Sequence, residues 1–249
     1  MSKWQRNLWF ATTLTGRNID SQFYNMTINY TNVHLRHEKR TILSGVNLQV
    51  QPGEMVYLTG LVGSGKSTLL SSMYGDTPVY NGRALVMNND MRKIGRSKLQ
   101  YLRRQIGIVH QELRLLSDRT IYDNLDFVLR ATDWGHKNLR QERIEEVLNW
   151  VEMPDAGKCY PHELSGGQKQ CVCIARAILN HPELIIADEP TGQLDAENGE
   201  RVMALLDEVR RQTGCAVVIS THNMQWPEYF PGTVYVCENE TLTRKSNNQ

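Results

Sequence analysis

The sequence lacks the features of a secreted or membrane-embedded protein. No apolar run approaches the ~20 residues that cross a bilayer, and no charged-then-apolar leader precedes a cleavage site. The five cysteines are an odd number without a repeated paired spacing, which argues against a disulfide framework and indicates a reducing compartment. These absences predict a soluble, cytoplasmic protein.

An excess of charge of one sign is also lacking. The 249 residues include 28 basic and 27 acidic side chains, for a formal net charge of +1, so the composition gives no sign of a nucleic-acid partner. The sequence has no internal repeat and no low-complexity tract. Cys171 and Cys173 lie two residues apart on a predicted helix and point to different faces, so we expect buried small side chains and not a metal pair.

Residues 1–25 differ from the rest of the chain. Trp4 and Trp9 stand among polar residues without a period, whereas Met26 opens the first strand pattern, MTINYTNV. Three interpretations of this extension are open: a loosely ordered arm, a partner-binding segment, or an upstream start codon assigned in error. We favour the first or the third. We expect residues 26–249 to form one domain.

The stretch GLVGSGKSTLL lies where a strand pattern ends and a helix pattern begins. It fits G-x-x-x-x-G-K-[ST], a phosphate-binding loop, although a plain glycine-rich turn is the alternative. Its glycines let successive N–H groups turn toward one centre, and the helix N-terminus adds partial positive charge. Lys66 would reach the β- and γ-phosphates, and Ser67 would ligate Mg²⁺. The residues expected to bind the nucleotide here are Gly60, Leu61, Val62, Gly63, Ser64, Gly65, Lys66, Ser67 and Thr68.

A pair of carboxylates ends the apolar strand pattern LIIADEP. Asp188 and Glu189 would be costly there unless they are paired or used, and they could cap the next helix. Beside a phosphate loop we favour a Walker B element, in which Asp188 holds Mg²⁺ through water and Glu189 accepts the proton of the attacking water. His222 ends the strand VVIST; it is expected to contact the γ-phosphate and orient that water, unless it is an ordinary polar strand end.

Strand and helix patterns alternate through most of the chain. Short alternating strands precede the phosphate loop, and the βαβ rhythm of the final third implies a mainly parallel sheet covered by helices. Apolar stripes with helical spacing fall in a segment at 112–160 that looks inserted. We therefore expect an α/β fold: a P-loop NTPase core with a mainly parallel sheet, an N-terminal antiparallel β layer and an inserted α-helical subdomain.

A second anion-binding nest is predicted in HELSGGQKQ, where a serine and two glycines start a helix. One nucleotide does not need two phosphate nests in one chain. Two copies of the chain would need them if each nest closed on the nucleotide of the other copy. The sequence therefore predicts a homodimer around two nucleotides.

The order and spacing of these motifs, with Gln111 after IGIVH and with GQLD and STHN, resemble the nucleotide-binding domain of ABC transporters over roughly residues 26–245. The stretches YLRRQIGIVHQELRLLSDRTIYDN and DEPTGQLD look most like the FtsE family of cell-division ATPases; lipoprotein-release and MacB-type efflux ATPases are similar. The resemblance implies the ABC ATPase fold and hydrolysis of ATP to ADP and phosphate with Mg²⁺.

The resemblance also implies roles for further residues. Gln111 matches the Q-loop, which senses Mg²⁺ and the γ-phosphate and moves with a membrane partner. Asp195 matches the D-loop carboxylate, which meets the other subunit near its P-loop, and His222 matches the switch histidine. The signature motif, which completes the ATP site of the opposite subunit, matches Ser165, Gly166, Gly167 and Gln168.

Some positions depart from the family pattern. The adenine-stacking aromatic falls near His37, where HLRHEKR has no clear aromatic, so His37 or Arg36 is expected to stack instead. Cys171 stands where the family often has Arg, and Asn223 stands where Asp commonly follows the switch histidine. Neither change removes a catalytic group, so we expect activity to survive.

The resemblance finally implies a partner. We expect a separately encoded, FtsX-like permease that holds the ATPase on the inner face of the cell membrane and controls cell-wall hydrolysis in division. The alternative is a lipoprotein-release or MacB-type exporter. A soluble ABC ATPase of ribosomes or DNA repair is a third class, but one cassette without a long heptad run disfavours it. Apolar anchors for the permease are expected from residues 112–124, unless they merely pack the subdomain: Leu115, Leu116, Ile121 and Tyr122.

Overall fold

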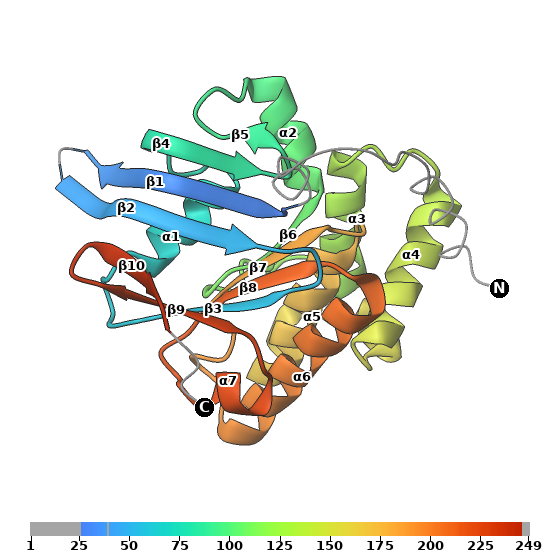
Figure 1. Cartoon of the computed structure of the whole chain (residues 1–249). Helices are drawn as coiled ribbons and strands as arrows, with labels where there is room; N and C mark the ends of the chain where they lie inside the picture. The colour runs from blue at the N-terminus through green and yellow to red at the C-terminus, as the bar shows by residue number, and fades with distance from the viewer. Residues whose placement is uncertain (1–25, 39, 246–249) are drawn as a thin grey trace, which may run out of the picture.

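Two β-sheets and the helices around them make up the computed structural model, which describes residues 26–38 and 40–245 (Figure 1). The expectations for residues 1–25 lie outside the described residues. The strands are β1 Ile28–His37, β2 Arg40–Val50, β3 Met55–Thr59, β4 Val79–Val86, β5 Asn89–Asp90, β6 Ile106–Val109, β7 Leu184–Asp188, β8 Ala216–Ser220, β9 Thr233–Glu238 and β10 Thr241–Arg244. The α-helices are α1 Lys66–Met73, α2 Arg96–Arg104, α3 Ile121–Ala131, α4 Lys137–Trp150, α5 Gly166–Ile178, α6 Ala196–Thr213 and α7 Trp226–Tyr229, and two 3₁₀ turns, η3 Pro154–Lys158 and η4 Pro161–Glu163, precede α5.

The two sheets differ in strand direction. The first, in the order β2-β1-β4-β5, is antiparallel throughout. The second has the order β10-β9-β3-β8-β7-β6; all of its pairs are parallel except the hairpin of β9 and β10. Strands of a parallel sheet are buried on both faces, which explains why every residue of β3 and β8 is buried. The predicted antiparallel layer and mainly parallel core sheet are confirmed.

The core sheet separates two hydrophobic cores. On one face, Val56 and Leu58 of β3 pack with α1 and with the antiparallel sheet. On the other face, Met55 and Tyr57 of the same strand pack with helices α3, α4, α5 and α6. This alternation is the period of two expected of a strand. The core sheet therefore has a fixed register, and the ends of its strands are held at defined positions.

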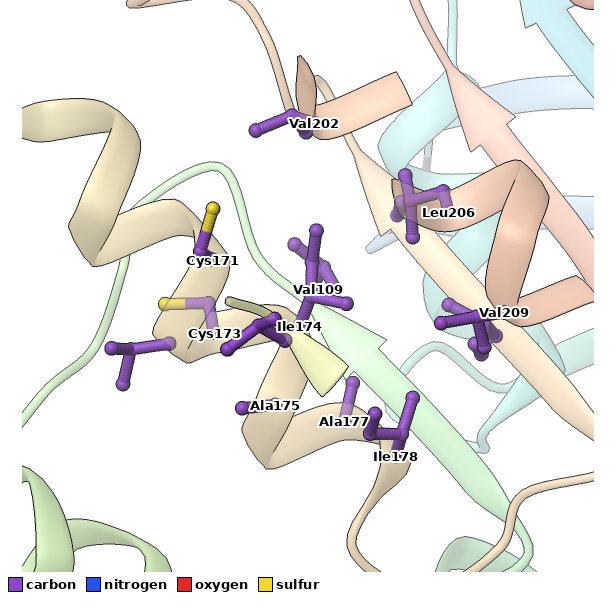
Figure 2. Packing of buried hydrophobic residues seen from close by; sticks show 14 of the residues in the cluster. Val109, Cys171, Cys173, Ile174, Ala175, Ala177, Ile178, Val202, Leu206 and Val209 are labelled. Atoms are coloured by element: carbon purple, nitrogen blue, oxygen red, sulfur yellow. The ribbon is translucent and has the colours of Figure 1, made fainter. Parts of the chain in front are cut away.

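Helix α5 packs with β6 and α6 in the second core (Figure 2). Val109 of β6 and Val202 of α6 belong to the same core as the buried residues of α5. Cys171 and Cys173 are buried, and their thiols point in different directions from the helix. The expectation of buried small side chains is confirmed, and burial raises the pKa of Cys173 to about 11, so this thiol is protonated at neutral pH.

Helices α3 and α4 form a helical region on the far side of α5 (Figure 1). Thr120 caps α3 by accepting from Asp123 N–H at 3.1 Å. A buried ion pair joins the two helices: Arg140 Nε of α4 donates to Asp126 Oδ1 of α3 at 2.6 Å. Among the described residues, no helix is long and apolar enough to cross a membrane.

Helix α2 and the hairpin of β9 and β10 were not among the elements expected from the sequence. The pattern of α2 is weak, because Leu102 is the only residue of its nine that is buried. The hairpin extends the core sheet beyond β3, and its strand β9 lies directly beside the phosphate loop. Sequence periodicity does not reveal such a long-range neighbour.

Candidate nucleotide site

The candidate site forms at the carboxyl ends of the parallel strands β3, β6, β7 and β8. The phosphate loop joins β3 to α1, and Lys66 Nζ donates to the carbonyl oxygens of Gly60 at 2.8 Å and Leu61 at 3.0 Å. The lysine ammonium is thereby held inside the loop. Gly60 has φ 135°, and a Cβ there would lie 2.3 Å from the carbonyl oxygen of Cys237 in β9. The loop therefore needs glycine at this position for both conformation and space.

The start of α1 fits a bound phosphate. Gly65 caps this helix in the left-handed conformation, without a side-chain hydrogen bond, and the first turn has no acidic residue. The N–H groups of the first turn are therefore available, and the helix dipole favours an anion. The buried hydroxyl of Ser64 has no hydrogen-bond partner among the described residues. Leu61 and Val62 are 83% and 95% exposed at the tip of the loop.

Asp188 lies beside the phosphate loop. Its Oδ1 accepts from Ser67 Oγ at 3.1 Å and from Ser220 Oγ at 2.5 Å. A hydroxyl and a carboxylate oxygen are the hard ligands that Mg²⁺ prefers, and this ion usually takes further ligands from water and nucleotide phosphates. The described residues contain no group of three His, Cys, Asp or Glu side chains that would hold a metal alone. The donor set at Ser67 and Asp188 thus fits Mg²⁺ delivered with a nucleotide.

Glu189 and His222 are in contact. His222 Nδ1 lies 2.9 Å from Glu189 Oε2, and the glutamate side chain is 13% exposed. The backbone of Glu189 has φ 47°, in the left-handed region that non-glycine residues rarely adopt. Its N–H donates to the carbonyl oxygen and to Oγ of Ser220. Together these contacts hold the glutamate at the rim of the phosphate loop.

The second predicted nest starts α5. Ser165 is the N-cap, and it forms a capping box with Gln168: Ser165 Oγ accepts from Gln168 N–H at 3.3 Å, and Gln168 Oε1 accepts from Ser165 N–H at 2.9 Å. Gly166 and Gly167 form the first turn of the helix. Among the described residues, no hydrogen bond or ion pair joins Ser165 or Gln168 to the phosphate loop. The two nests are thus not in hydrogen-bond contact within the described part of one chain.

Asp195 is tied to the second nest through Asn198. Asp195 caps α6 by accepting from Asn198 N–H at 2.9 Å and from Asn198 Nδ2 at 2.7 Å, and these bonds lower the pKa of its carboxyl. The other side-chain atom of Asn198, Oδ1, would lie 2.5 Å from a Cβ at Gly167. Asn198 therefore lies between Asp195 and the start of α5, a link that the sequence analysis missed.

Gln111 and His37 are both exposed residues at strand ends. Gln111 follows β6 after His110, and its side chain is exposed. His37 ends β1 and is also exposed. Beside it, the Arg36 guanidinium lies 3.7 Å from the ring centroid of Tyr80 of β4. The Tyr80 ring thus lies beside this end of β1 although it comes from the neighbouring strand β4. A search for an aromatic residue within HLRHEKR alone does not find Tyr80.

A comparison with protein families gives one match that decides the family: the model described as ABC transporter matches residues 43–192. The chain belongs to the ABC transporter family. It is accordingly an ABC-type ATPase, which binds ATP and hydrolyses it to ADP and phosphate. Asp188, Glu189 and the second nest all lie inside the matched range, and His222 lies beyond it.

Curated relatives of this ABC ATPase include FtsE proteins. The chain is 37% identical over 204 residues to the cell division ATP-binding protein FtsE of Streptococcus pneumoniae, covering 82% of this chain and 88% of that protein. It is 40% identical over 185 residues to FtsE of Escherichia coli, covering 74% and 82%. The methionine import ATP-binding protein MetN of Corynebacterium glutamicum is 40% identical over 201 residues, covering 80% of this chain and 55% of MetN.

Solved ABC cassettes share the fold. The dimeric structure of the bacterial ABC transporter cassette MJ0796 has a TM-score of 0.79 at 30% identity and covers 89% of this chain and 99% of that chain. A post-hydrolysis state of MJ0796 bound to ADP and Pi, also dimeric, has a TM-score of 0.79 at 29% identity, covering 89% and 99%. The expected ABC ATPase fold is confirmed.

Proposed function

We propose that this ABC ATPase closes as a homodimer around two MgATP. The exposed position of Ser165 and Gly166 at the start of α5 supports this, because a second copy could bring its Ser165 nest to the phosphate loop of the first. The dimeric state of MJ0796 also supports it. Each site then has a phosphate loop from one copy and a signature motif from the other, with Asp195 at the interface.

In each site we assign four residues to hydrolysis. Lys66 neutralises charge on the β- and γ-phosphates, and Glu189 accepts the proton of the attacking water. His222, hydrogen-bonded to Glu189, orients that water, and Gln111 reports the γ-phosphate and Mg²⁺ to the partner surface. Mg²⁺ would be held by Ser67, by Asp188 through water, and by Gln111. His37 remains the proposed adenine contact, with Arg36 held on Tyr80 beside it.

The membrane partner is proposed to be a separately encoded, FtsX-like permease. The FtsE relatives support this partner, and a surface cavity of about 350 Å³ between β6, α3 and α5 supplies the proposed docking site. His110, directly before Gln111, lines it, so a partner bound there would sense movement at the γ-phosphate. Burial, together with Arg114 and Arg176, lowers the pKa of His110, so the imidazole is neutral at pH 7.

The apolar anchors in this cavity differ from those expected. Ile121 is fully buried in the core, so its expectation as an anchor is wrong; Leu115 and Tyr122 also pack against that core. Leu116 does line the cavity and is 38% exposed. Phe127, which is 51% exposed on α3, supplies the larger apolar contact. Helical periodicity puts Ile121 on the inner face of α3 and leaves Phe127 outside.

Replacement of Phe127 tests the docking site. Phe127→Ser should weaken co-purification with the detergent-solubilised FtsX-type permease by about thirtyfold, the effect of losing one interface hot spot, while ATP binding stays intact. Tyr229→Ser is the matched control, because Tyr229 is an exposed aromatic on α7, away from the cavity. Equal co-purification of the two variants would show that the permease docks elsewhere.

We propose that the complex controls cell-wall hydrolysis in division; the FtsE relatives, which are named as cell division proteins, support the division part of this proposal. The alternative, a lipoprotein-release or MacB-type exporter, has a different consequence in cells. Expression of a Glu189→Gln chain should trap the complex in its ATP-bound state. Under the division proposal, cells should form undivided filaments or chains; normal division with retained lipoprotein or substrate would support export.

A further inference from the structure

Ser220 lies at the end of β8, beside the strand β7 that leads into the proposed Mg²⁺ ligand Asp188 and the proposed base Glu189. It is the last residue of β8 and is fully buried. It pairs in register with Asp188, the last residue of the neighbouring parallel strand β7. A serine at a strand end is common, so its pattern alone drew no prediction. Its position becomes significant only through the pairing of β7 with β8.

The hydroxyl of Ser220 makes two hydrogen bonds within the site. It donates to Asp188 Oδ1 at 2.5 Å and accepts from Glu189 N–H at 3.0 Å. A serine hydroxyl has one proton to donate, and Asp188 receives it. Ser67 donates to the same Asp188 oxygen. The two hydroxyls therefore fix the direction of the Asp188 carboxylate relative to the phosphate loop, and a buried bond to a charged acceptor is strong.

The end of β8 also fixes Glu189. The left-handed backbone of Glu189 is unfavourable by itself and persists where its surroundings hold it. The carbonyl oxygen and Oγ of Ser220 both receive its N–H. Two residues later, His222 holds its carboxylate. Ser220 at the end of β8 thus binds the backbone of the proposed general base, and His222 just after it contacts the side chain.

Ser72 shows what a purely structural buried serine looks like in this chain. It is also fully buried, and its hydroxyl contacts Tyr30 Oη at 3.1 Å and donates to Leu69 O at 2.7 Å. Those partners belong to the hydrophobic core between α1 and the antiparallel sheet. The partners of Ser220, by contrast, are Asp188 and Glu189. This difference separates a positioning role from a packing role.

We propose that Ser220 is a positioning residue for ATP hydrolysis. It orients the Asp188 carboxylate toward Mg²⁺ and holds the Glu189 peptide in the conformation that presents the general base. The inference rests on the proposed roles of Asp188 and Glu189. It predicts that the Ser220 hydroxyl affects how the site takes up Mg²⁺, an effect that loss of a core hydroxyl does not have.

The test compares Ser220→Ala with Ser72→Ala in the full chain. For each variant, the half-saturating Mg²⁺ concentration at fixed ATP, kcat and Tm are measured, together with the rise in Tm caused by ATP with Mg²⁺ or with EDTA. Ser220→Ala should raise the half-saturating Mg²⁺ concentration about tenfold and lower kcat, the effect of losing one charge-assisted hydrogen bond. The rise in Tm with ATP and EDTA should be unchanged.

Ser72→Ala should lower Tm and leave the Mg²⁺ requirement unchanged. The proposal is rejected if Ser220→Ala has the Mg²⁺ requirement of the unmodified chain, or if its kcat falls only as far as the Ser72→Ala control at equal Tm. Failure of the proposed permease or division role can be distinguished from failure of this inference. Loss of permease binding or of a division phenotype changes neither the half-saturating Mg²⁺ concentration nor the kcat or Tm of the isolated chain. Normal turnover of Glu189→Gln would remove the base assignment alone and leave the Mg²⁺ result standing.

Discussion

Glu189 combines a costly backbone conformation with a fixed side chain. A left-handed conformation costs a non-glycine residue about 1 kcal/mol, yet Glu189 adopts it with φ 47° beside Asp188. Its carboxylate is largely buried and contacts His222. Such strain is retained where the surroundings over-determine it, as the two bonds to Ser220 do here. This arrangement suits a base that must face the γ-phosphate in a single orientation.

Replacing Glu189 with Gln tests the base directly. The amide keeps the size of the side chain and its contact with His222 but accepts no proton, so turnover should fall by about 10²–10⁴. ATP binding should persist, and the variant should accumulate as an ATP-bound dimer on gel filtration. Lys66→Ala provides the contrasting variant, because loss of the ammonium should weaken nucleotide binding itself. Near-normal turnover of Glu189→Gln would reject the assignment.

Sequence reasoning at single residues succeeded where a motif fixes the chemistry. The spacing of the phosphate loop and the strand end LIIADEP led us to expect Ser67 and Asp188 together, and their side chains are in hydrogen-bond contact. Ser220 and Asn198 were missed because each acts through a neighbour that is distant in sequence. Strand register decides the first, and the packing of α6 against α5 decides the second. Periodicity carries neither kind of information.

At the scale of elements, α3 and α4 are held together by a buried ion pair. Burial alone would raise the pKa of Asp126, but hydrogen bonds from Arg140 and Arg130 outweigh that effect and hold the pKa below its usual value near 3.8. Arg140 also donates to the carbonyl oxygens of Trp134 and Gly135. The pair therefore fixes the loop between the two helices. Its aspartate, Asp126, lies on α3, the same helix as the proposed permease anchor Phe127.

Asp126→Asn should lower the free energy of unfolding by about 3 kcal/mol at pH 7, because Arg140 would be left buried without a counter-charge. Since the folded-state pKa of Asp126 is depressed, its contribution is present above its ordinary pKa and is lost as pH falls through the folded-state value. The difference between variant and unmodified chain should therefore shrink below pH ~4. Urea unfolding from pH 7 to pH 3 measures it.

Asp133→Asn is the control for this prediction. Asp133 forms an ion pair with Arg104 at 2.6 Å, but its side chain is 76% exposed. Solvent screens such a pair, so the loss should stay below about 1 kcal/mol. Equal destabilisation by the two changes would mean that the buried pair does not join the helices as described.

The elements that the sequence predicts well are those with a strong local pattern. The apolar runs of β7 and β8 and the helix start at Ser165 were predicted from the sequence, whereas the cap at Asp195 was not. Helix α2 was missed because it is short and buries only Leu102 of its nine residues, so it has no apolar stripe of several residues. The β9–β10 hairpin was missed because its place beside Gly60 depends on the pairing of β3 with β9, two strands that are far apart in the sequence.

At the scale of the molecule, the two hydrophobic cores anchor different parts of the proposed site. One core joins the antiparallel sheet, α1 and the sheet face beneath the phosphate loop. The other joins the helical region, α5 and α6 to the opposite sheet face. The sheet itself is shared, so the phosphate loop and the Ser165 nest are anchored in different cores of one body. Movement of one core relative to the other would change the distance between a nest and its nucleotide.

The composite site gives a prediction for two variants mixed together. A Ser165→Arg chain has an intact phosphate loop, so it should bind ATP, but the bulky cation at the exposed start of α5 should block closure on the second copy. A Lys66→Ala chain has an intact nest but binds nucleotide weakly. A dimer of one chain of each kind contains one complete site, formed by the phosphate loop of the first and the nest of the second. Mixing the two nearly inactive proteins should therefore restore ATP turnover, with a rate that rises with protein concentration. Turnover by either chain alone at the full rate, independent of concentration, would contradict the shared site.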